Sequence, residues 1–142
     1  MKFSVNQKDL QQSLGFCQGV IEKRSTLPIL SNILLEAYNS KLKITATDLD
    51  LIFINEINDV EVIEEGKTTT TSSTLYDIIR KFSSGKKINF NLTTENKIQL
   101  ESEKSVFNLN CMSADEFPLM EENFTENEFV LKSKQFLKLL SK

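Results

Sequence analysis

The stretch "KFSVNQKDLQQSLGF" (Lys2 to Phe16) opens the chain and changes its hydrophobic period within a few residues. Phe3 and Val5 alternate with polar residues, which is typical of a half-buried β-strand. The apolar residues that follow recur at helical spacing, at Leu10, Leu14, Cys17 and Ile21. The pattern therefore predicts a strand that runs directly into a helix spanning residues 6–21, with Asn6 as the N-cap.

Two further stretches repeat this change of period. A helix from about Thr74 to Phe82 follows the strand pattern "KTTTTS", and "EFVLKSKQFLKLLSK" (Glu128 to Lys142) matches the opening stretch position by position. In all three copies the last inward strand residue lies five positions before the first apolar helix residue, in the pairs Val5 and Leu10, Thr70 and Leu75, Leu131 and Phe136. This even spacing indicates an internal repeat. We expect Thr74 and Asp77 to cap the second helix and Gly85 to end it.

Strands are predicted throughout the remaining chain, where apolar and polar residues alternate and β-branched residues are frequent. The segments are "NILLEAY", "KLKITAT", "DLIFINEI", "VEVIE", "KINFNL", "KIQLES" and "VFNLNC". Short polar links between them favour antiparallel hairpins. The fold class is therefore predicted as α+β with two half-repeats, each made of a strand, a helix and several strands. We assign residues 1–125 to one domain and 126–142 to the first strand and the start of the first helix of an incomplete second domain.

The composition is that of a globular domain, with 142 residues, 39% hydrophobic and 26% charged. No apolar run approaches the roughly 20 residues that cross a bilayer, so we expect a cytoplasmic protein without membrane contact. The formal net charge of -3 argues against binding nucleic acid over the whole surface. Any contact with nucleic acid is therefore expected to be local. Cys17 and Cys111 stand among apolar residues and are expected to pack as reduced thiols.

Catalytic and metal-binding patterns are sparse. The chain has no histidine, no Gly-x-Ser-x-Gly elbow, no Cys-x-x-Cys and no phosphate loop among its 4 glycines. Asp48 and Asp50 in "TDLDL" would share one face of a strand and could hold Mg²⁺, but bonding to nearby backbone N–H groups is the favoured interpretation. We predict no enzyme, no cofactor and no metal site.

The segment "KRSTLPILSNILLEAYNSKLKITATDLDLIF" (Lys23 to Phe53) resembles the N-terminal domain of bacterial sliding clamps, the beta subunit of DNA polymerase III. "MKFSV", "YDIIR" (Tyr76 to Arg80) and "DEFP" (Asp115 to Pro118) extend the resemblance in the same order and spacing. It implies a DNA-clamp fold, with antiparallel sheets outside and two helices on the inner face.

The resemblance also implies a function. Clamp subunits are three-domain, non-catalytic processivity factors of DNA replication, and two subunits form a head-to-tail homodimer. Their ring encircles double-stranded DNA without reading its sequence and tethers the replicative polymerase. The polymerase and the clamp loader bind through domains that this chain lacks.

Basic residues near the two helices are the candidate DNA contacts. Arg24 begins the motif "R-x-TLPIL" and matches the basic residue that touches DNA in the family. The other candidates are Lys23, Lys8, Arg80 and Lys81. For Lys8 and Lys81 an equal alternative is that they only keep a polar helix face solvated. Ser73 and Thr74 stand where other clamps often carry basic residues, so phosphate binding is expected to be weaker here.

The late strand "VFNLNC" carries the candidate dimer interface. The resemblance implies that Phe107 and Leu109 pack across the ring interface, with Lys97 and Lys104 facing acidic residues of the second subunit. The alternatives are that the two apolar residues belong to the domain core and that the lysines keep a free sheet edge soluble.

A second function stays open beside the clamp. It is a non-catalytic, β-rich adaptor that binds a peptide along a sheet edge by strand addition. An enzyme comes third, because the patterns described above offer it no catalytic group.

Overall fold

The computed structural model describes residues 1–21, 26–94, 96–119 and 129–141. Within these residues the strands are β1 (Lys2–Asn6), β2 (Asn32–Tyr38), β3 (Lys41–Thr47), β4 (Ile52–Ile57), β5 (Glu61–Glu64), β6 (Gly66–Thr71), β7 (Lys87–Leu92), β8 (Lys97–Ser102) and β9 (Ser105–Met112). The α-helices are α1 (Gln7–Cys17), α2 (Ser72–Ile79) and α3 (Ser133–Leu140). Two short 3-10 helices, η1 (Pro28–Ser31) and η2 (Ala114–Glu116), complete the set.

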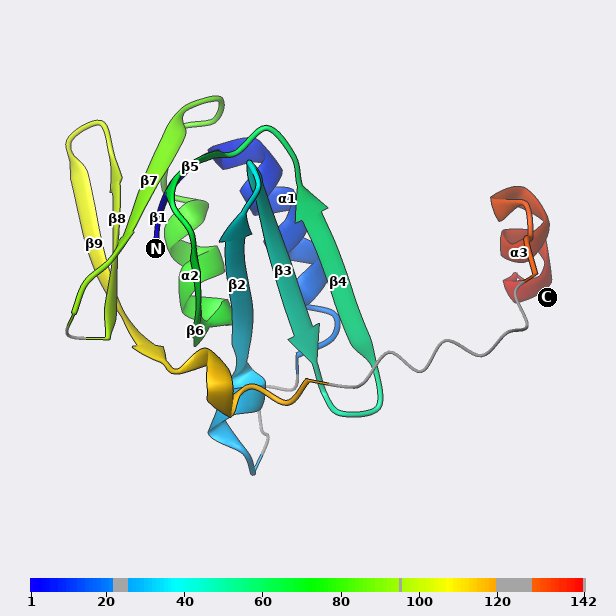
Figure 1. Ribbon diagram of the computed structural model, residues 1–142. Helices are drawn as coiled ribbons and strands as arrows, with labels where there is room; N and C mark the ends of the chain where they lie inside the picture. The colour runs from blue at the N-terminus through cyan, green and yellow to red at the C-terminus, as the bar shows by residue number, and fades with distance from the viewer. Residues whose placement is uncertain (22–25, 95, 120–128, 142) are drawn as a thin grey trace.

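The strands form one antiparallel sheet in the order β4-β3-β2-β6-β9-β8-β7-β1-β5. The two half-repeats exchange their first strands, because β6 pairs with β2 of the first half and β1 pairs with β7 of the second. Helices α1 and α2 pack together on one face of this sheet (Figure 1). The predicted α+β clamp architecture is confirmed, with the difference that the expected sheets are continuous through β9, which pairs with both β8 and β6.

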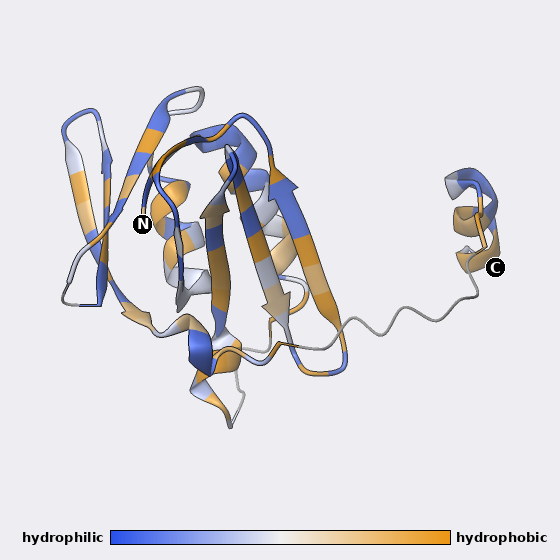
Figure 2. Cartoon of the chain, viewed as in Figure 1, coloured by the Kyte–Doolittle hydropathy of each residue, from blue (hydrophilic) through white to orange (hydrophobic). Residues whose placement is uncertain are grey.

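The core lies between the sheet and the helix pair. Alternating strand residues point into it, which Figure 2 shows as alternating hydrophobic and hydrophilic bands along the strands. Phe3 of β1 and Phe90 of β7 stack with ring centroids 4.7 Å apart and form a cross-strand contact at the junction of the two halves. Because this contact joins residues of different half-repeats, neither half can complete its core alone.

Helix α1 begins as predicted and ends earlier than predicted. The Asn6 side chain accepts a hydrogen bond from the backbone N–H of Lys8 over 2.9 Å, which confirms Asn6 as the N-cap. The helix stops at Cys17 and the chain turns. Ile21 is not helical, but it follows this turn and packs against the core. Its apolar side chain therefore continued the helical spacing in the sequence.

The predicted limits of α2 are wrong. The helix starts at Ser72, directly after β6, with Thr71 as its N-cap and no side-chain capping bond, so Thr74 and Asp77 lie inside the helix. It ends at Ile79, and Gly85, with φ of +78°, lies in the loop before β7. Four consecutive threonines and two serines gave the pattern several equivalent capping positions.

The outer face of the sheet carries a small second core. Leu34 of β2 packs there with Ile29 from η1 and with Ala114 and Phe117 from the region of η2. The Asn32 side-chain Nδ2 donates to Thr69 Oγ1 over 3.1 Å, and Thr71 Oγ1 donates to Asn32 Oδ1 over 3.3 Å. The motifs "TLPILSN" and "DEFP", which are far apart in the sequence, therefore meet on this face of the sheet.

The C-terminal stretch forms the predicted helix, α3, but residues 129–132 form no strand. All thirteen described residues, 129–141, are exposed, with Phe136 49% and Leu140 67% accessible. Figure 1 shows α3 apart from the sheet. A strand needs a neighbouring strand for its hydrogen bonds, and none lies beside these four residues in the described structure. That they open a second domain stays a proposal.

Candidate nucleic-acid interface and sheet edge

The helix pair is joined by a buried side chain. Gln7, 1% exposed, donates from Nε2 to the Ile79 carbonyl oxygen over 2.9 Å and to Gln11 Oε1 over 2.8 Å. Its backbone N–H bonds to the Lys86 carbonyl oxygen over 2.9 Å. The Ile79 bond ties the start of α1 to the end of α2, and the Lys86 bond ties it to the loop before β7. Consequently Lys8 and Arg80, each next to one of the bonded residues, come to the same end of the helix pair.

The predicted DNA contacts on this face are exposed. Within residues 1–21, 26–94, 96–119 and 129–141, no carboxylate lies within ion-pair distance of Lys8, Arg80 or Lys81. Five lysines elsewhere form ion pairs, Lys41 with Glu56, Lys43 with Glu36, Lys67 with Asp115, Lys86 with Glu103, and Lys87 with Glu61, whereas exposed Lys2, Lys97 and Lys104 form none among the described residues. The helix face therefore leaves its cations available to an external anion. Exposed Asp9 and Asp77 on the same helices keep its charge density low.

Lys23 and Arg24 lie outside the described residues. Their assignment to DNA binding accordingly stays a prediction from the motif that they begin.

The predicted dimer strand, β9, has one free edge. It pairs with β8 over Ser105 to Asn110 but with β6 only through Cys111 and Met112, so residues 105–110 have a single strand neighbour in the described sheet. Leu109 is 9% exposed and belongs to the core, while half-buried Phe107 packs edge-on against Phe82 with centroids 5.5 Å apart. Both side chains contribute to the core, and Phe107 lies at its open rim.

The predicted interface lysines flank this strand. Lys97 begins β8 and Lys104 lies in the turn between β8 and β9. Both are exposed, and neither pairs with a carboxylate of the described chain. They are free to meet acidic residues of another subunit or to remain solvated.

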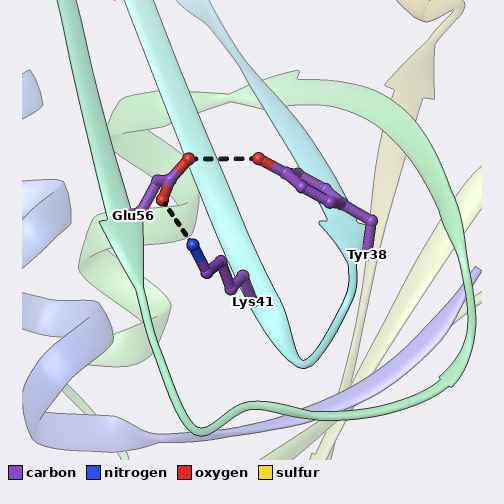
Figure 3. Close-up of polar contacts among 3 residues, drawn as sticks. All are labelled: Tyr38, Lys41 and Glu56. Atoms are coloured by element: carbon purple, nitrogen blue, oxygen red, sulfur yellow. Dashed lines mark hydrogen bonds and ion pairs between the residues drawn. The ribbon is translucent and has the colours of Figure 1, made fainter.

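A polar cluster lies at the β4 end of the sheet, with Tyr38 on β2, Lys41 on β3 and Glu56 on β4 (Figure 3). Lys41 Nζ lies 3.2 Å from Glu56 Oε2, and the Tyr38 hydroxyl donates to Glu56 Oε1 over 3.1 Å. The Lys41 hydrogen bond, followed by that of Tyr38, lowers the pKa of Glu56 below its ordinary value. Desolvation and the nearby Glu56 raise the pKa of Tyr38. The cluster is solvent-exposed, so its contribution to stability is small.

The two cysteines are free thiols, as predicted. Burial raises the pKa of Cys17 to about 12 and also raises that of Cys111. A thiol with a raised pKa is a poor nucleophile near neutral pH.

Asp48 and Asp50 lie in the turn before β4, which begins at Ile52, so they do not share a strand face as predicted. Asp48 Oδ1 accepts from the backbone N–H groups of Asp50 and Leu51 over 3.0 and 2.7 Å, which confirms the preferred interpretation for Asp48. In the described residues no three His, Cys, Asp or Glu side chains come close enough to hold a metal ion.

Comparison with known proteins decides the family. The family model for the DNA polymerase III beta subunit, N-terminal domain, matches residues 1–121. The chain belongs to the DNA polymerase III beta subunit family. Members of this family with similar sequences include the beta sliding clamp of Caulobacter vibrioides, 32% identical over 143 residues, and that of Escherichia coli K12, 34% identical over 131 residues.

Solved beta subunits share the fold. The Caulobacter crescentus pol III beta structure superposes with a TM-score of 0.93 at 32% identity and covers 100% of this chain. The beta subunit of Pseudomonas aeruginosa reaches 0.93 at 28% identity and covers 99%. In both cases the match takes in 38% of the longer chain, so the present chain spans about two fifths of its relatives' length.

The match to the Caulobacter vibrioides clamp likewise covers 100% of this chain and 38% of the relative, and that to the Escherichia coli clamp covers 92% and 36%. No helix in the described part of this beta-subunit domain is long and apolar enough to cross a membrane.

One positioning residue escaped the sequence analysis. No sequence pattern singled out Gln7, yet it joins the two helices of this beta-subunit domain. Its partner is a backbone carbonyl 72 positions away, which no single-sequence pattern marks. Only its place immediately after the N-cap, on the side of the helix that bears Leu10 and Leu14, could have suggested burial.

Proposed function

We propose that this chain is the first domain of a ring-shaped sliding clamp that encircles duplex DNA and tethers the replicative polymerase. The observation that carries the proposal is the helix face, which presents exposed Lys8, Arg80 and Lys81 without a carboxylate partner among the described residues. A surface of this kind contacts phosphates without reading bases.

The domain works without bond chemistry in this proposal. Its two thiols have raised pKa values, and the described residues hold no metal cluster. Retention on DNA comes from topology, so a low density of phosphate contacts suffices. Each contact between a basic side chain and a phosphate that is lost makes the negative slope of log affinity against log salt shallower by about 0.9 for B-DNA.

Ring closure is assigned to the β9 edge. Residues 105–110 have a strand neighbour on one side only, and of their backbone groups the Asn110 carbonyl oxygen accepts a hydrogen bond from Thr70 Oγ1. Phe107 offers an apolar side chain there, and Lys97 and Lys104 offer charge to an acidic partner. In the complete polypeptide we expect this edge to pair with the third domain of a second subunit. We further propose that residues 126–142 begin the second domain, which supplies the strand neighbours that 129–132 lack.

The interface proposal is tested with the complete three-domain protein by sedimentation. Phe107→Asp places a charge at the rim of the β9 edge and should convert dimers to monomers at micromolar concentration. Ile63→Asp places the same charge at an exposed apolar position of β5, at the end of the sheet, and should leave the dimer intact. Unchanged dimerisation of Phe107→Asp would remove this edge from the ring.

Arg24 has its own test. Arg24→Ala in the complete protein should reduce loading onto primed DNA. It should also make the slope of log affinity against log salt shallower by about 0.9, the contribution of one phosphate contact. If loading and slope match those of the unmutated protein, Arg24 is not a phosphate contact.

The free β9 edge also supports the second candidate, an adaptor that binds a peptide by strand addition. The two functions differ in the full-length assembly. An adaptor edge stays open to peptides in the native oligomer, whereas the edge of a closed ring is occupied.

A further inference from the structure

The Arg80 side chain lies over an aromatic ring on the helix face. Its guanidinium carbon lies 5.4 Å from the centre of the Tyr76 ring, one helical turn earlier. In the described chain it has no carboxylate partner, and neither Lys8 nor Lys81 has a comparable ring contact there. Arg80 thus differs from the other two candidate contacts in being held before any anion arrives.

The Tyr76 ring is itself held by its surroundings. It packs partly buried against the core, and its far edge lies against α1 at Gly15, where an added Cβ would stand 3.7 Å from the Tyr76 hydroxyl oxygen and 3.9 Å from a ring carbon. The backbone just before Arg80 is fixed as well, because the Ile79 carbonyl oxygen accepts the buried bond from Gln7. Both the platform and the attachment point of the arginine are therefore fixed.

Stacking on a ring occupies the face of a guanidinium and leaves its N–H groups, which lie in the plane, able to donate. A backbone phosphate is the anion that such a pre-arranged fork fits, through two parallel hydrogen bonds. Tyr76 also lines, together with Lys8, an open hollow of about 660 Å³ beside α1.

We infer that Tyr76 is a positioning residue that holds Arg80 for contact with a phosphate of the DNA backbone. The inference rests on the proposed function and adds a residue that touches no DNA itself. Holding the side chain in place reduces the rotamer freedom that it loses on binding. Removing the ring should weaken duplex binding about two- to fivefold, the range expected for a cation–π contact at an exposed site.

The test measures duplex affinity of the 142-residue chain at low salt by NMR titration, following backbone amide signals in every variant and the Arg80 side-chain Nε–Hε signal in those that keep Arg80. Tyr76→Leu removes the ring, and Tyr76→Phe keeps it and serves as the matched control. Arg80→Lys keeps the charge without the planar fork. We expect Tyr76→Leu and Arg80→Lys to bind equally weakly and Tyr76→Phe to bind like the unmutated chain. Unchanged amide signals of buried strand residues away from α2, at Ile44 and Leu100, establish that each variant is folded.

A double variant separates positioning from general support of the helix. In an Arg80→Ala background, Tyr76→Leu should have no further effect on affinity. A further loss in that background, or full affinity of Tyr76→Leu alone, would overturn the inference. Full affinity of Arg80→Ala would overturn it while leaving the clamp proposal intact. Absence of any salt-dependent duplex binding by the unmutated chain would overturn the inference, because Arg80 would then contact no phosphate, and the ring proposal would be decided by the retention of the complete protein on circular DNA.

Discussion

Gln7 of α1 and Ile79 of α2 are joined by a buried 2.9 Å hydrogen bond from the Gln7 amide to the Ile79 carbonyl oxygen. Gln7 Oε1 is buried without a partner among the described residues, so the side chain is held by its donor group alone. The spacing of the two helices at this end of the domain therefore depends on one amide N–H₂ group.

Gln7→Glu keeps the shape of the side chain and removes the donor. At pH 7 it should lower the free energy of unfolding by more than about 2 kcal/mol, because a carboxylate is buried facing a carbonyl oxygen. Part of the loss should return at low pH, when the carboxyl group regains a proton to donate. Gln12→Glu, an exposed change on the same helix, should stay within about 0.5 kcal/mol. Equal urea midpoints for the two variants would show that the Gln7 bond is unimportant.

The Glu56 cluster predicts a pH dependence of stability. Lys41 and Tyr38 hold the pKa of Glu56 in the folded chain below its ordinary 4.5. The ionised group therefore stabilises the fold above pH 4.5, and this contribution is lost as the pH falls through the lowered pKa. Glu56→Gln should be less stable than the unmutated chain at pH 7, and the two should converge on acidification.

Lys41→Met removes the largest cause of the shift and should reduce the difference between Glu and Gln at position 56. Thermal melts from pH 7 down to about pH 3 measure both effects, which salt should weaken because the pair is exposed. A difference that stays constant over this range would disprove the ionisation effect.

Burial of the thiols predicts their reactivity. At pH 8 Cys17, with a pKa raised to about 12, should react with a thiol reagent only as fast as the domain opens. Cys111, half-buried with a raised pKa, should react faster than Cys17 but more slowly than a free thiol. Both should react at once in denaturant. Immediate labelling of Cys17 in the native chain would contradict its place in the core.

Helix α3 should be the least protected helix. Its apolar stripe, including Phe136 and Leu140, is exposed, whereas Leu10 and Leu14 of α1 are fully buried. Amide exchange in Ser133–Leu140 should therefore approach the rate of an unstructured peptide, while the interior of α1 exchanges only on larger openings. Protection of α3 equal to that of α1 would mean that the helix has found a partner.

Local patterns predicted the elements of this domain well where side chains alternate across one buried face. The bounds of β2, β3, β7 and β8 agree with the segments expected from the period of two. The helix limits were less predictable. Ile21 continues the apolar spacing from a turn, and the run of threonine and serine before Leu75 offers several equal starts for α2.

Contacts between distant segments could not be read from local patterns. The exchange of β1 and β6 between halves, the Asn32 bridge to Thr69 and the Gln7 bond to Ile79 all join residues far apart in the sequence, from 29 positions for Ala37 and Gly66 upward. The motif resemblance anticipated the fold because it carries such long-range information indirectly. Arg80 was a candidate contact because it is a basic residue on the second predicted helix, but the Tyr76 ring beneath it emerged only from the packed helix pair.

The central claim is that this domain belongs to a ring held on DNA by topology. The most direct measurement compares the retention of the complete protein, once loaded, on nicked circular DNA before and after the circle is cut at one site. The account predicts long retention on the circle at a salt concentration that abolishes ordinary phosphate binding, and rapid loss through the free ends after linearisation. Equal dissociation from circular and linear DNA would contradict it.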